Sequence, residues 1–326
     1  MKLSVAMCTY NGEKYVSEQL ASILSQNRKV DEIIIGDDGS KDHTVALCSS
    51  ILEQADVEFR IIRNPENLGY RKNFENVIRA CSGDIIFLSD QDDVWAENKT
   101  ECMIDCLERE PEALLAFSDA YLTDRELNPT ELSLWESVGY IECRDRYPDW
   151  WSLFLKGYFV TGAAVCFRRR LFELSEPFSD IWQHDGWLAV NACIYGEIVP
   201  VPQKLISYRQ HGDNQIGAIR SKSAADIMKA KWKVLKSGRS GQAELHHLAC
   251  ERSAELLRRR KKDLSGEQIR SLEEAIKVHR LLDTLQNKNM LESLRIIRYC
   301  HIHGFYEKYY KKSRGSMLAD LMFLTV

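Results

Sequence analysis

The sequence predicts an α/β fold, in which a mostly parallel sheet is covered by helices on both faces and is followed by a helical C-terminal region. Three observations support this. Apolar and amphipathic runs alternate through the first third of the chain, polar motifs stand where apolar runs end, and strand-like runs disappear after about residue 219. This alternation is typical of βαβ units, whose strands are buried on both faces.

The first elements follow one another in short order. A strand is expected in the apolar run from Leu3 to Cys8, and an amphipathic helix from Tyr15 to Leu24. A second strand spans Glu32 to Gly36, and the spacing of apolar residues from Thr44 to Leu52 predicts a second helix. These two strands and two helices form the first βαβ unit and the helix that follows it.

The same rhythm continues to residue 88. A strand is expected from Val57 to Ile62, a helix from Asn73 to Cys81, and a strand from Asp84 to Leu88. In open sheets of this kind, ligands bind beyond the carboxyl ends of the strands. The polar residues that follow these strands are therefore the candidate site.

The C-terminal part is expected to be helical. Ile269, Leu272, Ile276, His279 and Leu282 recur at helical spacing. We therefore divide the chain into an α/β domain over residues 1–218 and a helical region over residues 219–326.

Composition excludes several classes of protein. The chain has 326 residues, 44% of them hydrophobic, and a formal net charge of -4, so neither disorder nor a nucleic-acid partner is required. Its cysteines are scattered without a CxxC pair, which favours reduced thiols in the cytoplasm. The longest uncharged apolar stretch, from Gly157 to Phe167, is shorter than the roughly 18 residues of a spanning helix.

Acidic residues concentrate at the end of one strand. Asp90, Asp92 and Asp93 directly follow the apolar run from Ile85 to Leu88. Carboxylates gathered in one place repel one another unless a hard cation such as Mg²⁺ or Mn²⁺ binds them. The alternative is that they form a turn and cap a helix, since Asp is common in both roles.

A second acidic pair, Asp37 and Asp38, follows the second strand and precedes Gly39 and Ser40. This pattern is also typical of a turn followed by a cap. A carboxylate fixed at a strand end can instead accept hydrogen bonds from a base or a ribose. We expect one of the two to do so.

Four motifs occur in a characteristic order: Thr-Tyr-Asn-Gly at 9–12, Asp-Asp-Gly-Ser at 37–40, Asn-Pro-Glu-Asn-Leu-Gly at 64–69 and Asp-Gln-Asp-Asp at 90–93. Each motif alone is weak, but the four in this order resemble glycosyltransferase family 2, the inverting GT-A enzymes. The resemblance implies a GT-A fold over about residues 1–218.

The likeness extends through residues 162–164, 184–187 and 208–212, and the last two segments are similar to the bacterial rhamnosyltransferase-type branch. The chain lacks the Gln-x-x-Arg-Trp segment and the membrane helices of processive polysaccharide synthases. The resemblance therefore implies the addition of a single sugar.

The resemblance also implies roles for individual residues. Asp92 would ligate a Mn²⁺ or Mg²⁺ ion at the donor diphosphate, and Asp185 stands where the family has its catalytic base. The implied nucleotide and donor contacts are Thr9, Tyr10, Asn11, Asp37, Asp38, Asn67, Lys72, Asp90 and Gln91.

Several of these roles have alternatives. His211 is a second metal ligand, a diphosphate donor or only a structural contact. Asp185 is either the base or the N-cap of a helix from Gly186 to Tyr195. His184 is an alternative base and an acceptor contact, while Trp182 and Trp187 are either an apolar wall for the acceptor or core residues.

The predicted function is inverting transfer of one sugar, plausibly L-rhamnose from dTDP-L-rhamnose or a sugar from a UDP donor, to a saccharide or a lipid-linked saccharide. A non-catalytic scaffold that binds nucleotide or glycan is the first alternative. An aspartate-based phosphoryl transferase is the second, but such enzymes usually carry paired acids after the first strand, and here Thr9, Tyr10 and Asn11 stand there.

The basic run from Arg258 to Lys262 is the main feature of the C-terminal region. It is either a solvated helix face or a contact with a polyanionic partner or an anionic membrane. In the membrane case, the segment from Phe305 to Lys312 and the apolar tail from Met317 to Val326 would take part. Aromatic interleaving is missing, so nucleic acid is not an expected partner. A homodimer is compatible with the sequence.

Overall fold

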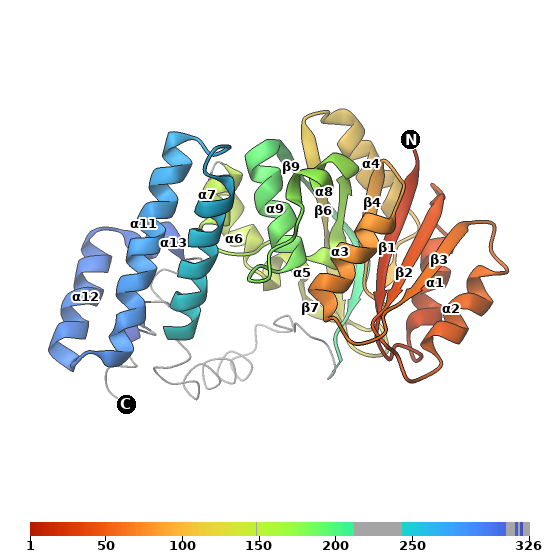
Figure 1. The fold of residues 1–326 in the computed structure, drawn as a ribbon, viewed down its shortest axis with the longest axis horizontal. Helices are drawn as coiled ribbons and strands as arrows, with labels where there is room; N and C mark the ends of the chain where they lie inside the picture. The colour runs from red at the N-terminus through yellow and green to blue at the C-terminus, as the bar shows by residue number, and fades with distance from the viewer. Residues whose placement is uncertain (148, 212–242, 311–316, 319, 322–326) are drawn as a thin grey trace. The chain divides into compact units, whose positions relative to one another are not determined.

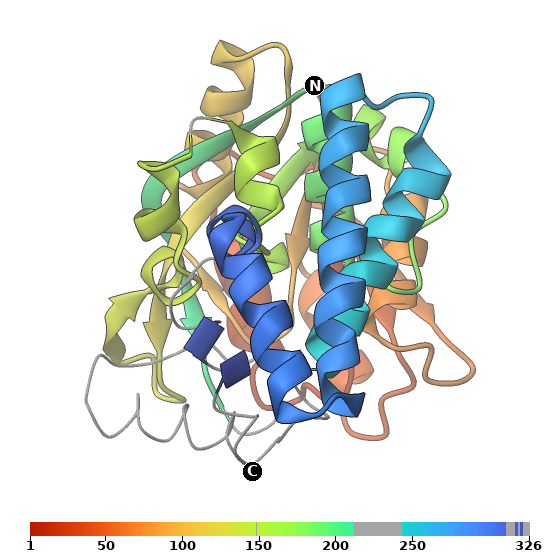
Figure 2. The same ribbon diagram turned by 90° about the vertical axis from the view of Figure 1, so that its left-hand side faces the viewer.

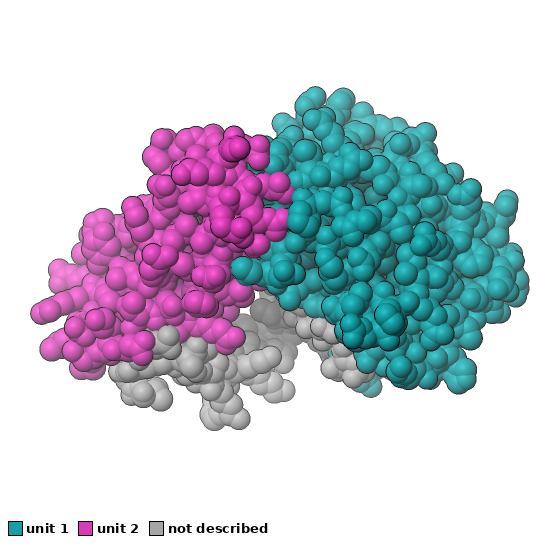
Figure 3. All heavy atoms as spheres, in the orientation of Figure 1, with its two compact units in different colours: residues 1–138, 159–220 teal, residues 139–158, 221–326 magenta. Residues whose placement is uncertain are grey.

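The described residues form two compact units (Figure 3). Unit 1 consists of Met1–Val138 with Phe159–Arg220, and unit 2 of Gly139–Tyr158 with Ser221–Val326. The computed structural model describes residues 1–147, 149–211, 243–310, 317–318 and 320–321. The boundary predicted between residues 218 and 219 lies outside the described residues.

The first four long strands of unit 1 form a parallel sheet, as the sequence predicts (Figure 1). Strand β1 (Leu3–Thr9) lies between β2 (Glu32–Asp37) and β4 (Ile85–Ser89), and β3 (Glu58–Arg63) pairs with the far edge of β2. Every residue of β1 is buried, because both faces of the sheet are covered.

The remaining strands extend this sheet with mixed directions. Beyond β4 the order is β8, β6, β9 and β5, with β7 paired to β6. Only the β6–β9 pair in this half is parallel. A buried antiparallel strand carries the same continuous apolar run as a parallel one, so the pattern could not reveal this difference. The strands are β5 (Val94–Trp95), β6 (Ala113–Thr123), β7 (Pro129–Ser133), β8 (Val165–Arg168) and β9 (Glu197–Arg209).

Helices pack on the sheet of unit 1 and bury its apolar side chains (Figure 1). Val5 and Met7 of β1 belong to one core with Leu20 of α1, Cys48 of α2 and Met103 of α4. The helices are α1 (Val16–Leu24), α2 (Thr44–Leu52), α3 (Tyr70–Ala80), α4 (Lys99–Arg109), α5 (Leu134–Ser137), α8 (Arg169–Ser175), α9 (His184–Tyr195) and the 3-10 turn η1 (Gly162–Ala164).

Unit 2 is helical, and its helices α11 (Gly266–Asp283) and α12 (Met290–Ile302) lie side by side (Figure 2). Its core contains Val278 and Leu282 from α11 and Ile297 and Cys300 from α12. Its other helical segments are α6 (Tyr140–Arg144), α7 (Trp150–Phe154), residues 243–260, η2 (Thr284–Asn287) and α13 (Phe305–Tyr309). Among the described residues, no helix is long and apolar enough to cross a bilayer.

Candidate active site

The carboxyl ends of β1, β2 and β4 are joined by side-chain hydrogen bonds. The hydroxyl of Thr9 donates to Oδ1 of Asp37 at 3.0 Å. The amide N–H of Tyr10 donates to Oε1 of Gln91 at 2.8 Å, and Nε2 of Gln91 donates back to the carbonyl of Tyr10 at 3.0 Å. The predicted donor residues of these three strands are therefore held against one another.

Asn11 makes the turn after β1 possible. Its φ of 48° lies in the left-handed region, which Asn tolerates better than most residues. Its amide N–H donates to Oγ of Ser40 and its Oδ1 accepts from the amide of Lys41, both at 2.9 Å. The turn after β1 is thus bound to the turn after β2.

Asp38 organises the loop that precedes α3. Its carboxylate accepts from Nδ2 of Asn64 at 2.9 Å and from the amides of Leu68 at 2.8 Å and Gly69 at 2.9 Å. Asn67 donates to the carbonyl of Asp38 at 3.3 Å. Asp38 therefore positions this loop, and its role toward a base stays a prediction.

Asp90, Asp92 and Asp93, which follow β4, form an acidic centre. Asp93 is buried, and its Oδ1 accepts from the amide of Arg209 at 3.0 Å. Within the described part of the chain, its Oδ2 has no hydrogen-bond partner. Burial, with the charges of Asp92 and Asp90, raises the pKa of Asp93 well above its usual range.

Asp90 connects this centre to α9. Burial, together with the negative charges of Asp92 and Asp185, raises the pKa of Asp90 to about 7, and the charge of Lys99 opposes this rise. Asp185 accepts a hydrogen bond from the amide of Gly162 in η1, and this turn packs against β4, the strand that precedes Asp90. The fold therefore brings Asp185 to the acidic centre from a segment far along the chain.

Asp185 does not have the position of a helix N-cap. Helix α9 begins at His184, and its N-cap residue is Gln183, so Asp185 lies in the first turn. Oδ2 of Asp185 accepts from the amide of Gly162 at 2.9 Å, and Oδ1 accepts from the amide of Gly186 at 2.7 Å. These bonds orient the carboxylate and leave lone pairs for a third group.

His211 reaches the acidic centre after β9. Its Nε2 lies 2.6 Å from Oδ2 of Asp92, and its ring stacks on Tyr15 with 5.0 Å between ring centroids. Arg209 donates from Nε to the carbonyl of Asp92 at 2.7 Å and also binds the carboxylate of Glu18. Asp92 and His211, the two predicted metal ligands, are therefore adjacent, and contacts with Arg209 and Tyr15 hold them in place.

Lys99 is a site residue that the sequence does not reveal. Its side chain is 0% exposed, and its Nζ donates to the carbonyl of Ala163 at 2.9 Å and lies 3.7 Å from the ring centroid of Trp95. Burial lowers the pKa of Lys99 to about 7, while Asp93 and Asp90 act in the opposite direction. In its charged form Lys99 opposes the rise in the pKa of Asp90 and of Asp93.

Tyr208 is a second such residue. Burial raises the pKa of Tyr208 well above its usual range, and the charges of Asp93, Asp90, Asp92 and Asp185 add to this effect. Tyr208 directly precedes Arg209, whose amide donates to Oδ1 of Asp93. A tyrosine in an apolar strand gives no local signal of such a position, because only the fold brings the four acids to it.

The acceptor contacts predicted at Trp182 and Trp187 do not fit the structure. Trp187 is 0% exposed and donates from Nε1 to the carbonyl of Ser175 at 2.7 Å, and Trp182 is buried with its ring 6.2 Å from that of Trp187. A buried ring offers no surface to a sugar. Core packing, the alternative left open by the sequence, accounts for both residues.

His184 is likewise held inside unit 1. Its ring stacks on Phe74 with 4.2 Å between centroids, and burial lowers the pKa of His184. In the described residues neither ring nitrogen has a hydrogen-bond partner. This position argues against His184 both as the base and as an acceptor contact.

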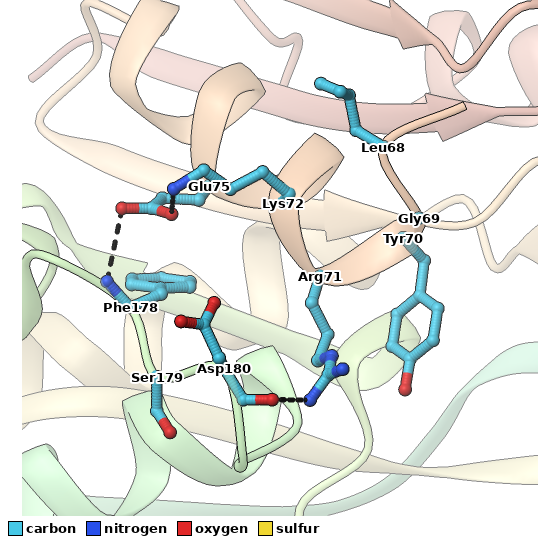
Figure 4. A pocket seen from close by; sticks show the side chains of 9 residues that line it. All are labelled: Leu68, Gly69, Tyr70, Arg71, Lys72, Glu75, Phe178, Ser179 and Asp180. Carbon is cyan, nitrogen blue, oxygen red and sulfur yellow. Dashed lines mark hydrogen bonds and ion pairs between the residues drawn. The ribbon is translucent and has the colours of Figure 1, made fainter. Parts of the chain in front are cut away.

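Lys72 lies in a separate hollow at the start of α3 (Figure 4). Its Nζ is 2.7 Å from Oε2 of the buried Glu75, and Arg71 donates to the carbonyl of Asp180. The pocket has a volume of about 160 Å³ and contains none of the acids that follow β4. It is lined by Leu68, Gly69, Tyr70, Arg71, Lys72, Glu75, Phe178, Ser179 and Asp180.

The donor set for a metal ion is small. Across the described ranges, no group of three or more His, Cys, Asp or Glu side chains could hold a metal ion. Asp92 and His211 supply two ligand atoms. Mg²⁺ is often bound by one or two carboxylates together with substrate phosphates. The pair therefore fits a metal shared with a phosphate ligand, and it does not fit a metal held by the protein alone.

Comparison with known proteins places this chain in a family. The family model described as "Glycosyl transferase family 2" matches residues 4–173, more than half of the chain. The dTDP-rhamnosyl transferase RfbG of Shigella flexneri is 28% identical over 243 residues, which cover 70% of this chain and 78% of that protein. The chain spans 59% of the length of the uncharacterized mycobacterial relatives that it matches at 26% identity.

Two solved structures share the fold. Staphylococcus aureus TarS (residues 1–349), determined in complex with UDP-GlcNAc, matches with a TM-score of 0.60 at 12% identity over 98% of this chain and 89% of that chain. The mannosyltransferase PcManGT of Pyrobaculum calidifontis, in complex with GDP-Man and Mn²⁺, matches with a TM-score of 0.52 at 14% identity over 99% and 87%. These identities support the fold alone.

Proposed function

Because the chain belongs to glycosyl transferase family 2, we propose that it transfers a single sugar from a nucleotide-activated donor to a saccharide or lipid-linked saccharide acceptor. The observation that carries this proposal is that Asp185 accepts a hydrogen bond from Gly162 in η1, the turn that packs against β4 just before Asp90. The charge of Asp185 also raises the pKa of Asp90, at the strand ends where such sheets bind ligands.

The donor side of the proposed site consists of the turns after β1, β2 and β4. Thr9, Tyr10 and Asn11 lie in a rigid frame in which hydrogen bonds join the three turns. A frame of this kind positions a nucleotide without a large rearrangement, which is the main protein contribution to oriented transfer.

Asp92 and His211 are the proposed ligands of a Mn²⁺ or Mg²⁺ ion that also binds the donor diphosphate. Such an ion, when bound, stabilises the negative charge that develops on the leaving phosphate. The structure of PcManGT contains Mn²⁺ together with GDP-Man, which is consistent with this choice of ion. Because Asp92 and His211 are the two ligands found among the described residues, we expect tight metal binding only when the nucleotide is present.

Asp185 is the proposed base. One of its oxygens accepts the proton of the acceptor hydroxyl as that oxygen attacks the anomeric carbon from the side opposite the diphosphate. The new glycosidic bond forms while the anomeric C–O bond to phosphate breaks, and the nucleoside diphosphate leaves with the bonding pair. The amide of Gly162 holds Asp185 in place during this step.

We propose L-rhamnose, carried by dTDP, as the transferred sugar. The support is the similarity to the Shigella flexneri dTDP-rhamnosyl transferase, which covers most of both chains. Sugar identity depends on pocket contacts rather than on the motifs of the nucleotide site, so UDP sugars belong in the same test.

We also propose that the enzyme works in the cytoplasm. Buried Cys8, Cys81 and Cys166 are free thiols. Thiols that stay reduced are typical of such a compartment.

A donor panel tests the proposal. Purified protein would be mixed with dTDP-rhamnose, UDP sugars or GDP-mannose, with and without Mn²⁺ or Mg²⁺, and donor hydrolysis and thermal unfolding would be followed. The correct donor should raise the unfolding temperature only together with the metal, by mass action. Asp92→Asn should remove the metal-dependent part of this shift and abolish transfer. Equal turnover and equal metal dependence in this variant would refute the assignment.

A further inference from the structure

Helix α12 of unit 2 has an unusual outward side. Its inward side is ordinary, because Ser293, Ile297 and Cys300 are buried at helical spacing. On the opposite side, Leu291 is 67% exposed and Ile302 is 65% exposed. A surface helix normally carries polar or charged residues there, so these two side chains are not explained by packing within the unit.

The same outward side is cationic. Arg295 and Arg298 are exposed, and with 3.6 residues per turn they lie on the same side as Leu291 and Ile302. The flanks of this side carry further exposed apolar residues, Met290, Leu294 and Tyr299. The outward side of α12 therefore combines long apolar side chains with arginines.

We propose that the outward side of α12 binds the surface of an anionic lipid bilayer. A helix with apolar and basic side chains on its exposed side lies in the boundary between headgroups and acyl chains, where it buries the apolar groups and pairs its cations with lipid phosphates. Leu291 and Ile302 supply the apolar part, and Arg295 and Arg298 supply the charge.

The C-terminal end of α12 strengthens this assignment. The rings of Tyr299 and His303 lie 4.1 Å apart between centroids, and the ring of Phe305 lies 5.7 Å from that of His303. Tyr299 is half exposed. Rings with an apolar body and a polar edge are enriched at the membrane–water boundary.

A second copy of the chain fits this surface less well. A two-fold dimer would place α12 against its own copy, so Arg295 and Arg298 would face the same arginines. The only acid in α12 is Glu292, which is bound at the start of the helix through the amide of Asn289 and Lys288. No carboxylate of α12 is therefore available to neutralise the arginines, whereas an anionic bilayer supplies many.

The basic run from Arg258 to Lys262 differs from this surface. Arg258, Lys261 and Lys262 lie toward solvent, while Arg259 pairs with Glu255. No large apolar side chain is exposed beside them in that run. This run can add a salt-sensitive attraction, but it offers nothing to insert into the bilayer.

Vesicle flotation of the full chain tests the proposal. Wild-type protein should float with phosphatidylglycerol vesicles and not with phosphatidylcholine vesicles, and added salt should weaken its binding. The pair Leu291→Gln and Ile302→Gln should lower the partition coefficient about tenfold or more at every salt concentration. Arg295→Gln and Arg298→Gln should each lower it about fivefold at low salt and less at high salt.

Two controls make the test specific. Leu245→Gln changes a side chain of similar exposure on another helix of unit 2, at 61%, and should leave binding unchanged. Circular dichroism verifies that each variant keeps its helices. The inference is overturned if the Leu291 and Ile302 pair binds like wild type, if Leu245→Gln weakens binding equally, or if sedimentation shows a dimer that the α12 variants dissociate. None of these readouts uses the transfer reaction, so failure of the proposed function leaves the test intact.

Discussion

Units 1 and 2 both bury titratable side chains, but they do so in opposite ways. At the strand ends of unit 1, burial and repulsion by Asp92 raise the pKa of Asp90 and of Asp93, and one oxygen of Asp93 lacks a hydrogen-bond partner among the described residues. Burial and repulsion make this arrangement unfavourable in the absence of a ligand.

In unit 2 a cluster of buried polar groups is internally satisfied. Nε2 of His246 lies 3.1 Å from Oδ1 of Asp320, and the hydroxyl of Tyr306 donates to Oδ2 of Asp320 at 2.5 Å. The hydroxyl of Tyr310 lies 2.9 Å from Nδ1 of His246 and 3.3 Å from Nδ1 of His279. A connected network of this kind stabilises one packing arrangement.

The difference indicates where function resides. A site that binds a cation and a phosphorylated donor needs unbalanced charge before binding, and it lowers the stability of the free protein. A network with internal partners has no such need. The predictions below test this distinction.

The largest expected effect is at Asp185. Replacing it with Asn keeps its shape and one of its two hydrogen bonds from backbone amides but removes the proton acceptor. Single-turnover transfer should therefore fall by about 10²- to 10⁴-fold, while the donor dissociation constant hardly moves. Asp180→Asn, an exposed acid before α9, is the matched control and should behave like wild type. Retention of more than about a tenth of the wild-type rate would exclude Asp185 as the base.

The next effect concerns Lys99. Lys99→Met keeps the length of the side chain but removes its amino group and the bond to Ala163. The free energy of unfolding should fall by about 1–3 kcal/mol, because the carbonyl of Ala163 loses its donor and the acids lose the group that opposes their repulsion. Adding Asp93→Asn should recover part of this loss, since it removes one of these acids. Strictly additive losses in urea unfolding would show that the two residues are not coupled.

Lys99 also shows which features of the site could be predicted from the sequence and which could not. The strands β1, β2 and β4 and the polar motifs at their ends were predictable, because apolar runs and turn residues are local signals. A lysine four residues after Trp95 resembles any exposed helix residue, since its burial depends on distant segments. The same reason explains why Trp187, which has the local pattern of a ligand contact, lies in the core.

The sequence also contained no indication that residues 139–158 belong to unit 2. Trp151 donates from Nε1 to the hydroxyl of Ser271 at 2.9 Å, and Leu155 packs on the core that contains Val278. Local patterns predict helices in such a segment but not the helices against which they pack. Tertiary grouping therefore required the structure.

In unit 2, His279 should make stability depend on acid pH. Burial, with the charge of His246, lowers the pKa of His279 to about 3. Between about pH 6.5 and pH 3 the unfolded chain binds a proton that the folded chain does not, so stability falls as the pH drops. His279→Phe keeps a ring that does not titrate. Its stability relative to wild type should rise by about 1–3 kcal/mol from pH 7 to pH 4, as measured by urea unfolding.

In unit 1, Asp90 should show the opposite dependence with a smaller effect. Its pKa of about 7 lies above the ordinary value, because burial and the charges of Asp92 and Asp185 disfavour the carboxylate. Its contribution to stability is therefore present below about pH 4 and is lost as the pH rises through 7. Asp90→Asn does not titrate and should exceed wild type by about 1 kcal/mol at pH 8, after allowance for solvent screening of a half-buried group, but not at pH 4. The measurement belongs in metal-free buffer, because a bound cation would relieve the repulsion. The two variants' stability differences should thus change with pH in opposite directions, and a parallel change would remove the contrast between the units.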